Sequence, residues 1–115
     1  MAYNNYASSL NRLQRFEEAR SLLRKMIPVA RRALGESHRL PLKMRWIYAL
    51  TLYGDPSATL DDLREAVETL ESVARVWTRV FGEAHPETSM VQNTLAAAHT
   101  VLAARAAASS GPGAA

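Results

Sequence analysis

The 115-residue chain contains no cysteine. This absence excludes disulfide scaffolds, thiolate metal sites and cysteine nucleophiles, and it fits a reducing compartment. The chain also lacks any uncharged apolar run of the roughly 20 residues that span a bilayer. Its first residues show no basic segment followed by an apolar one, the pattern of a secretory signal. We therefore expect a cytoplasmic protein with no membrane-spanning segment.

Glycine is scarce, and its five copies are isolated at positions 35, 54, 82, 111 and 113. Isolated glycines cannot form a phosphate-binding loop or a dinucleotide fingerprint, and no GxSxG motif is present. The histidines His38, His85 and His99 lie far apart in the sequence, without an HExxH motif or a histidine–carboxylate cluster. A metal site needs several convergent ligands. We therefore expect no cofactor, no metal and no catalytic activity.

Adjacent carboxylates occur twice in the chain, and paired carboxylates can perform acid–base chemistry. Glu17 and Glu18 form one pair, and Asp61 and Asp62 form the other. Both pairs lie at expected helix starts, where negative charge complements the helix dipole. We therefore expect a structural role for both pairs.

Charge is unevenly distributed along the chain. Residues 1–45 carry ten Lys and Arg against three Glu, a net charge of +7, whereas residues 55–87 carry three Arg against eight Asp and Glu, a net charge of −5. Such a chain can attract an acidic partner to one end or associate head to tail with another copy. The simpler alternative is that the charges are solvent-exposed on helix faces, differ in number between the two halves and bind no partner. The basic residues do not form one stripe and the acidic half repels phosphate, which argues against nucleic-acid binding.

Apolar residues at three- and four-residue spacing predict helices over 16–34 and 60–81. Thr59 and Asp62 form a capping-box pattern at the start of the second of these. Further helices are expected over the opening residues to about 13, over about 41–53 and over about 86–106. Pro28 lies inside the first of the two periodic helices and should bend or weaken it. The segment 107–115 should be a disordered tail.

The chain repeats itself. "LGESH" at 34–38 returns as "FGEAH" at 81–85, 47 positions later, and "YASSL" at 6–10 returns as "YALTL" at 48–52, 42 positions later. The difference of five residues places an insertion at "GDPSAT", residues 54–59. In each pentapeptide a glycine follows the last apolar residue of a helix, the position that favours a left-handed backbone. Pro41 and Pro86 suit the first turn of the helix that follows, and His38 and His85 are expected to accept hydrogen bonds there.

These segments resemble a known family. "NNYA", "RFEEARSLL" and "ALGESH" in succession, together with "VFGEAHPET" at 80–88, resemble the kinesin light chain type of tetratricopeptide repeat, which exits through a Leu-Gly-x-x-His-Pro loop. The resemblance implies an all-α fold of helical hairpins, an α-solenoid of about five antiparallel helices over residues 1–106. The first exit departs from the pattern, since no proline follows His38 directly.

The same resemblance implies a non-catalytic scaffold that binds a peptide on the face lined by the first helix of each pair. The implied positions are Asn4, Asn5, Ser8, Asn11, Arg12, Lys43, Trp46, Leu50, Tyr53 and Asn93, with Ala97 extending the row. Carboxamides can pair with a peptide backbone, Trp46 and Tyr53 offer flat apolar area, and Arg12 and Lys43 attract an acidic partner. Trp77, by contrast, lies on an apolar stripe and is expected in the core.

A structural role is the alternative. The chain has two complete helix pairs and one unpaired final helix, whereas repeat arrays need about three repeats to bury a continuous core. A fragment of a longer array would stack on further helical repeats or self-associate. The identity of the partner cannot be read from these residues.

Overall fold

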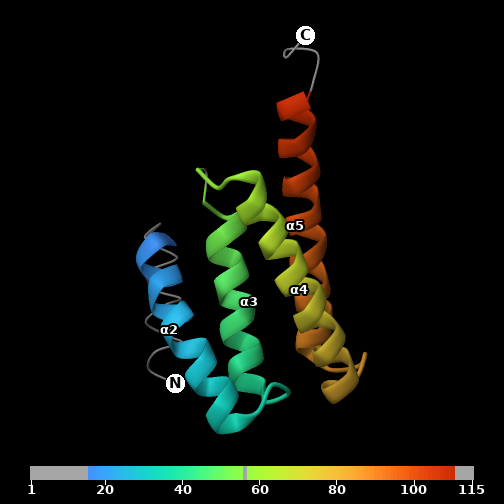
Figure 1. The fold of residues 1–115 in the computed structure, drawn as a ribbon. Coiled ribbons are helices and arrows are strands. Elements are labelled where there is room, and N and C mark those ends of the chain that lie inside the picture. Colours follow the sequence, from blue (N-terminus) through green and yellow to red (C-terminus); the bar gives the residue numbers. More distant parts are fainter. Residues whose placement is uncertain (1–15, 56, 111–115) are drawn as a thin grey trace.

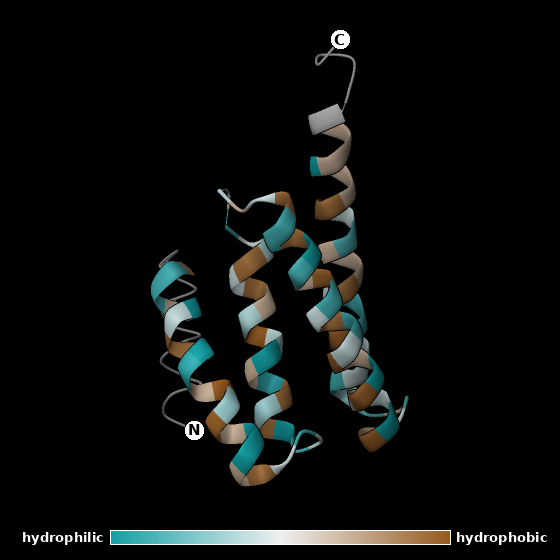
Figure 2. Ribbon diagram, viewed as in Figure 1, coloured by the Kyte–Doolittle hydropathy of each residue, from teal (hydrophilic) through white to brown (hydrophobic). Residues whose placement is uncertain are grey.

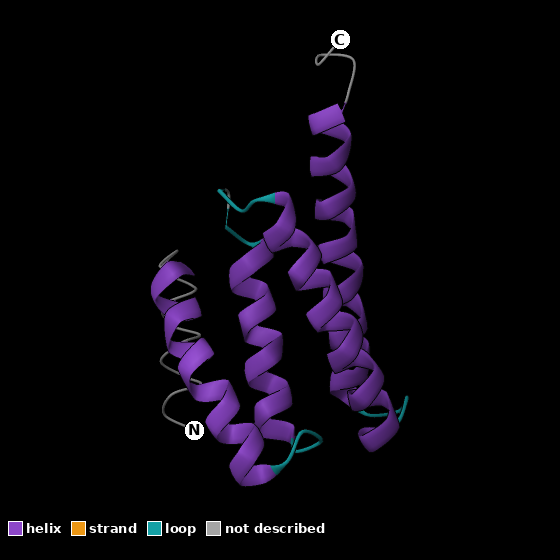
Figure 3. Ribbon diagram, viewed as in Figure 1, coloured by secondary structure: helices purple, strands orange, loops and turns teal. Residues whose placement is uncertain are grey.

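The computed structural model describes residues 16–55 and 57–110, with side chains described as far as Ala108. This part of the chain forms four helices and no strand: α2 (Phe16–Leu34), α3 (Arg39–Tyr53), α4 (Leu60–Phe81) and α5 (Pro86–Ser110) (Figure 3). The predicted all-α helical-hairpin fold is confirmed. The helix expected at the start of the chain lies outside the described residues.

Consecutive helices run in opposite directions and pack side by side (Figure 1). α3 lies between α2 and α4, α5 packs on α4, and α3 also contacts α5. Within the described residues, no Cα atom of α2 comes within 8 Å of one in α4. α3 is therefore the central helix, with one side toward α2 and α4 and another toward α5.

The two repeated pentapeptides adopt the same backbone structure. Gly35 has φ of 90° and Gly82 has φ of 85°. The Gly35 amide donates to the Arg31 carbonyl at 2.9 Å, and the Gly82 amide donates to the Thr78 carbonyl at 2.8 Å. Each glycine carbonyl then accepts from a histidine amide three residues later at 3.3 Å. The repeated pentapeptide is thus a helix C-terminus and glycine turn that occurs twice, as predicted. We call this feature the glycine exit.

The histidines that end these pentapeptides cap the helices that follow. His38 Nδ1 accepts from the Leu40 amide at 3.1 Å, and His85 Nδ1 accepts from the Glu87 amide at 3.0 Å. Each imidazole therefore satisfies one of the amides that a helix start leaves without a partner. The expected role of the two histidines at helix entry is confirmed.

The start of α4 carries the predicted capping box. Thr59 Oγ1 accepts from the Asp62 amide at 3.1 Å, and Asp62 Oδ2 accepts from the Thr59 amide at 3.0 Å. These two bonds satisfy amides on both sides of the helix start and fix where α4 begins.

α2 contains Pro28 in its interior and continues to Leu34, so the bend or weakening expected at Pro28 stays a prediction. The expected end of the last helix, by contrast, needs adjustment. α5 continues to Ser110, beyond the expected end near residue 106. Alanine is the strongest helix former, and the segment 103–108 is mainly alanine. Arg105 also ties this part of α5 to the Ala58 carbonyl.

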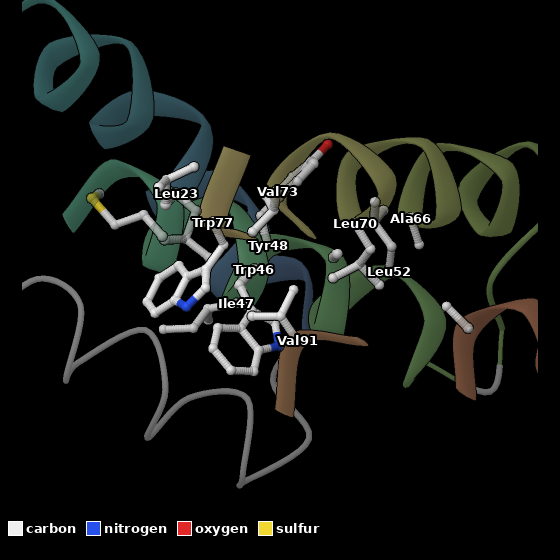
Figure 4. Close-up of a cluster of buried hydrophobic side chains, with 14 of the residues drawn as sticks. Leu23, Trp46, Ile47, Tyr48, Leu52, Ala66, Leu70, Val73, Trp77 and Val91 are labelled. Carbon is white, nitrogen blue, oxygen red and sulfur yellow. The ribbon is translucent and has the colours of Figure 1, made fainter. Parts of the chain in front are cut away.

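The core is centred on the contact between α3 and α4 (Figure 4). Trp77 is fully buried, as predicted, and its ring meets that of Trp46 edge-on, with centroids 6.0 Å apart. The surrounding fully buried aliphatic residues come from all four helices and are Leu23, Leu42, Leu52, Leu63, Leu70, Val73 and Val91. In Figure 2, hydrophobic and hydrophilic positions alternate along α2 and α4.

Two small residues set how closely the helices approach. Ala19 on α2 and Ala66 on α4 are both 0% exposed. Replacing either with leucine adds volume to a packed interface, so we expect the free energy of unfolding to fall by about 1–3 kcal/mol. Urea unfolding of each variant measures this loss.

Ala107→Leu is the matched control, because Ala107 is exposed on α5. Its unfolding free energy should stay within about 0.5 kcal/mol of the parent. Equal midpoints for all three variants would contradict the packing described for Ala19 and Ala66.

Candidate interaction surface

The side of the molecule where α3 and α5 meet carries the described residues expected to bind a peptide. We define the α3–α5 face by Lys43, Leu50 and Tyr53 of α3 and by Met90, Asn93 and Ala97 of α5. On α3 these residues share one stripe, because they are separated by about one or two helical turns. Trp46 and Thr94 join the two helices beneath this face through a hydrogen bond of 3.2 Å from Trp46 Nε1 to Thr94 Oγ1.

The exposure of these residues differs. Lys43, Leu50 and Tyr53 are half-buried, whereas Met90, Asn93 and Ala97 are exposed. Burial raises the pKa of the Tyr53 phenol, so Tyr53 stays neutral at physiological pH. The remaining expected positions, Asn4, Asn5, Ser8, Asn11 and Arg12, lie outside the described residues.

Trp46 requires a correction. Its side chain is only 6% exposed, so the expectation that it offers flat apolar area to a partner is wrong. Alignment of the repeats places it level with Asn4 and Asn93, which suggested a surface position. The indole packs edge-on against Trp77 of α4, and its N–H donates to Thr94 of α5. Trp46 therefore lies beneath the α3–α5 face and joins α3 to α4 and α5.

An ion-pair triad of Arg39, Lys43 and Glu87 lies at one end of the α3–α5 face. Arg39 Nη2 lies 2.9 Å from Glu87 Oε1, and Lys43 Nζ lies 2.5 Å from Glu87 Oε2. Lys43 Nζ also lies 5.5 Å from the centre of the Trp46 ring, within the range of a cation–π contact. The hydrogen bond from Lys43, followed by that from Arg39, holds the pKa of Glu87 below its usual value. The predicted attraction of Lys43 for an acidic partner is therefore opposed by a carboxylate of the same chain.

Glu87 is the residue of this surface that sequence reasoning missed. Its separation from Arg39 is 48 positions, close to the 47-position spacing of the two exits. Residues about one repeat period apart occupy nearly equivalent positions on α3 and α5, which are the first helices of successive pairs. The period could therefore have suggested that Arg39 and Glu87 lie near each other, although opposite charges at that spacing do not by themselves require a contact.

A second polar row joins α2, α3 and α4 on the other side of α3. Arg20 donates to the Thr51 carbonyl at 2.9 Å and to Asp55 Oδ2 at 3.3 Å. Arg24 donates to the Tyr48 hydroxyl at 3.3 Å, and Tyr48 in turn donates to Glu65 Oε2 at 2.7 Å. Burial, followed by the bond to Glu65, raises the pKa of Tyr48. This row holds the three helices in register.

In residues 16–55 and 57–110, no three His, Asp or Glu side chains come together as metal ligands would. None of the four described helices combines the length and the apolar character needed to cross a bilayer.

The triad around Glu87 generates a test that depends on pH. Because its folded pKa is lowered, Glu87 stabilises the fold above its ordinary value of 4.5, and this stabilisation is lost as the pH falls through the folded pKa. Glu87→Gln should therefore lower the unfolding free energy by about 1 kcal/mol at neutral pH. The difference from the parent should shrink toward zero in acid. Urea unfolding between neutral and acidic pH measures both quantities.

Glu68→Gln is the control, since Glu68 is exposed on α4 and the structure records no ion pair for it within the described residues. Its unfolding free energy should follow that of the parent within about 0.5 kcal/mol at every pH. A Glu87→Gln variant whose stability parallels the parent across the whole pH range would contradict the triad.

Comparison with known proteins adds one finding to this geometry. The family model described as Tetratricopeptide repeat matches residues 1–40 and 58–87, which is more than half of the chain. A search of curated proteins and a search of solved structures gave no match. The two matched segments include α2 and α4 with their glycine exits, so they coincide with the repeated unit. The chain therefore belongs to the tetratricopeptide repeat family, whose repeats generally act as protein–protein interaction modules.

Proposed function

We propose that this chain is a non-catalytic scaffold that binds an extended segment of another protein along the α3–α5 face. The observation that carries the proposal is that two helices related by the repeat, α3 with half-buried and α5 with exposed side chains, line one face around a fixed contact. The bond from Trp46 to Thr94 and the triad around Glu87 hold α3 and α5 together. A preformed surface loses little conformational entropy when it binds.

The chemistry of the face suits a peptide. The exposed carboxamide of Asn93 can donate to and accept from a peptide backbone at the same time. Leu50 and Tyr53 supply half-buried apolar area, and Met90, which is 53% exposed, adds a flexible apolar side chain. The proposed site also includes Asn4, Asn5, Ser8, Asn11 and Arg12 of the preceding segment.

Charge contributes less to this face than the sequence suggested. Arg39 and Lys43 share one carboxylate, so one positive charge remains at that end. An acidic residue of the partner would compete with Glu87 for Lys43. The proposal therefore assigns most of the affinity to apolar and carboxamide contacts, with a modest preference for an acidic residue near Lys43.

The repeated exit through glycine and histidine resembles that of kinesin light chain repeats, and we assign the chain to that subtype on the strength of residues 80–88. We propose a cytoplasmic location, which the cysteine-free composition accommodates.

A second candidate function is a structural one. The C-terminal part of α5 projects beyond the other described helices (Figure 1). It exposes alanines along much of its length, among them Ala96, Ala97, Ala103 and Ala104. Small residues allow close helix packing, so this surface favours stacking on another helical repeat or on a second copy of the chain.

Adjacent carboxamides on α5 give a matched test of the binding proposal. A peptide selected from a random display library against the full chain should lose affinity by about tenfold or more with Asn93→Ala, because a hydrogen bond in the complex is removed. Gln92→Ala should change affinity by less than about twofold, since Gln92 bonds to Glu83 and points toward the α4 exit.

Titration of the labelled peptide measures both affinities. Equal affinity for the parent and both variants would contradict binding on the α3–α5 face. Association of the chain that rises with its own concentration in sedimentation velocity, with no peptide enriched, would favour the stacking function instead.

A further inference from the structure

A second charged surface lies at the opposite side of α3, near the C-terminal end of α2. We call it the arginine cluster and define it as Arg31 and Arg32 of α2, Arg45 of α3 and Arg75 of α4. Arg31 and Arg32 line an open pocket of about 330 Å³ together with Pro28 and Glu36. Arg45 and Arg75 belong to the adjoining surface of α3 and α4, and neither residue contributes to the α3–α5 face.

Arg45 shows why the cluster differs from the polar row beside it. Its guanidinium is half-buried and donates to the Ser72 hydroxyl at 2.9 Å. Burial lowers the pKa of Arg45, and the nearby positive charges of Arg31 and Arg75 lower it further. Ser72 and Arg75 are three residues apart on α4 and therefore share one face of that helix.

The two neighbouring arginines of the row have acidic groups close by. Arg20 pairs with Asp55 at 3.3 Å, and Arg24 is linked through Tyr48 to Glu65. Within the described residues, the recorded side-chain partner of Arg45 is a neutral hydroxyl. A half-buried cation without a paired carboxylate is unfavourable, and an added anion removes that cost.

The charge balance of the arginine cluster also favours an anionic ligand. Glu36 pairs with Arg31 and is the carboxylate whose charge opposes the effect of the arginines on Arg45. Four guanidinium groups against one carboxylate leave a net charge of +3. Three of the four arginines, Arg31, Arg32 and Arg45, belong to the basic segment 1–45, and Arg75 of α4 adds a fourth positive charge.

We propose that the arginine cluster is a second binding site, separate from the α3–α5 face, that takes a short acidic segment of a partner protein. Guanidinium groups bind carboxylates through two parallel hydrogen bonds, and clusters of arginine are the usual means of recognising acidic motifs. Three uncompensated positive charges match a segment with two or three carboxylates.

The surroundings favour a short acidic peptide over nucleic acid. Glu65, Glu68 and Glu71 lie on α4 before Ser72 and Arg75, and Glu68 and Glu71 are exposed. A nucleic acid carries a charge at every phosphate and would pass these carboxylates as it continued along the surface. A short acidic segment held over Arg31, Arg45 and Arg75 need not continue along α4 past them.

The test uses a fluorescent, C-terminally amidated hexapeptide of alternating glutamate and glycine, which carries three carboxylates, with a glutamine–glycine hexapeptide as its uncharged counterpart. Fluorescence anisotropy with the full chain should show binding of the glutamate peptide and none of the glutamine peptide. Affinity should fall as salt rises from about 50 to about 200 mM, because the attraction is electrostatic and partly exposed.

Two arginines of α4 provide matched variants. Arg75→Gln should weaken binding of the glutamate peptide by about tenfold or more, since it removes a charge-assisted hydrogen bond. Arg64→Gln removes the same charge from the same helix at a site paired with Asp61, and it should change affinity by less than about twofold. Both side chains are exposed, so both variants should fold. Equal weakening by the two variants would overturn the proposal, since it would mean that net charge alone governs binding.

Amide chemical shifts of the parent chain give a readout that needs no variant. The glutamate peptide should shift the amides of Arg31, Ser72 and Arg75. Shifts confined to Asn93 and Ala97 would overturn the proposal by moving the acidic contact to the α3–α5 face. Tighter binding of an eight-nucleotide oligouridylate than of the glutamate peptide would also overturn it. None of these results bears on the peptide selected in the Asn93→Ala test, so the two proposals can fail separately.

Discussion

The left-handed backbone at Gly35 and Gly82 is the constraint on which the rest of the structure depends. With φ of 90° and 85°, each glycine ends one helix in a conformation that residues with a β-carbon rarely adopt. Its carbonyl accepts from the amide of His38 or His85, and the imidazole then caps the next helix. Because the same exit occurs twice, α2 turns onto α3 in the same way as α4 turns onto α5.

That repeated turn gives the central helix two different faces. Toward α5, α3 presents Lys43 and Trp46, which form the triad with Glu87 and the bond to Thr94. Toward α2 and α4 it presents Arg45 and Tyr48, which form the second polar row. The proposed peptide site and the proposed acidic-segment site therefore use opposite sides of one helix, and the second is the more positively charged of the two.

Local signals in the sequence predicted most of the fold. The glycine exits, the capping box at Thr59 and the buried Trp77 each follow from residues within a few positions of one another. Contacts between distant residues were harder to predict. Trp46 was expected at the surface because repeat alignment gives the position of a residue on its helix, whereas the reach of its side chain toward Trp77 decides its burial. Glu87 was missed because its two partners lie 44 and 48 positions away. The expected binding residues of the first fifteen positions stay predictions.

The most direct test of this account is the unfolding free energy of Gly82→Ala, measured in urea beside Glu83→Ala from the same loop. Gly82 has φ of 85° and ψ of 163°, a region that essentially only glycine occupies. A β-carbon there would meet no atom within 4 Å, so a loss of stability would reflect backbone strain and not a clash. The account predicts a loss of about 1–3 kcal/mol for Gly82→Ala and less than about 0.5 kcal/mol for Glu83→Ala. A Gly82→Ala variant as stable as the parent would contradict the left-handed exit and the arrangement of helices that it fixes.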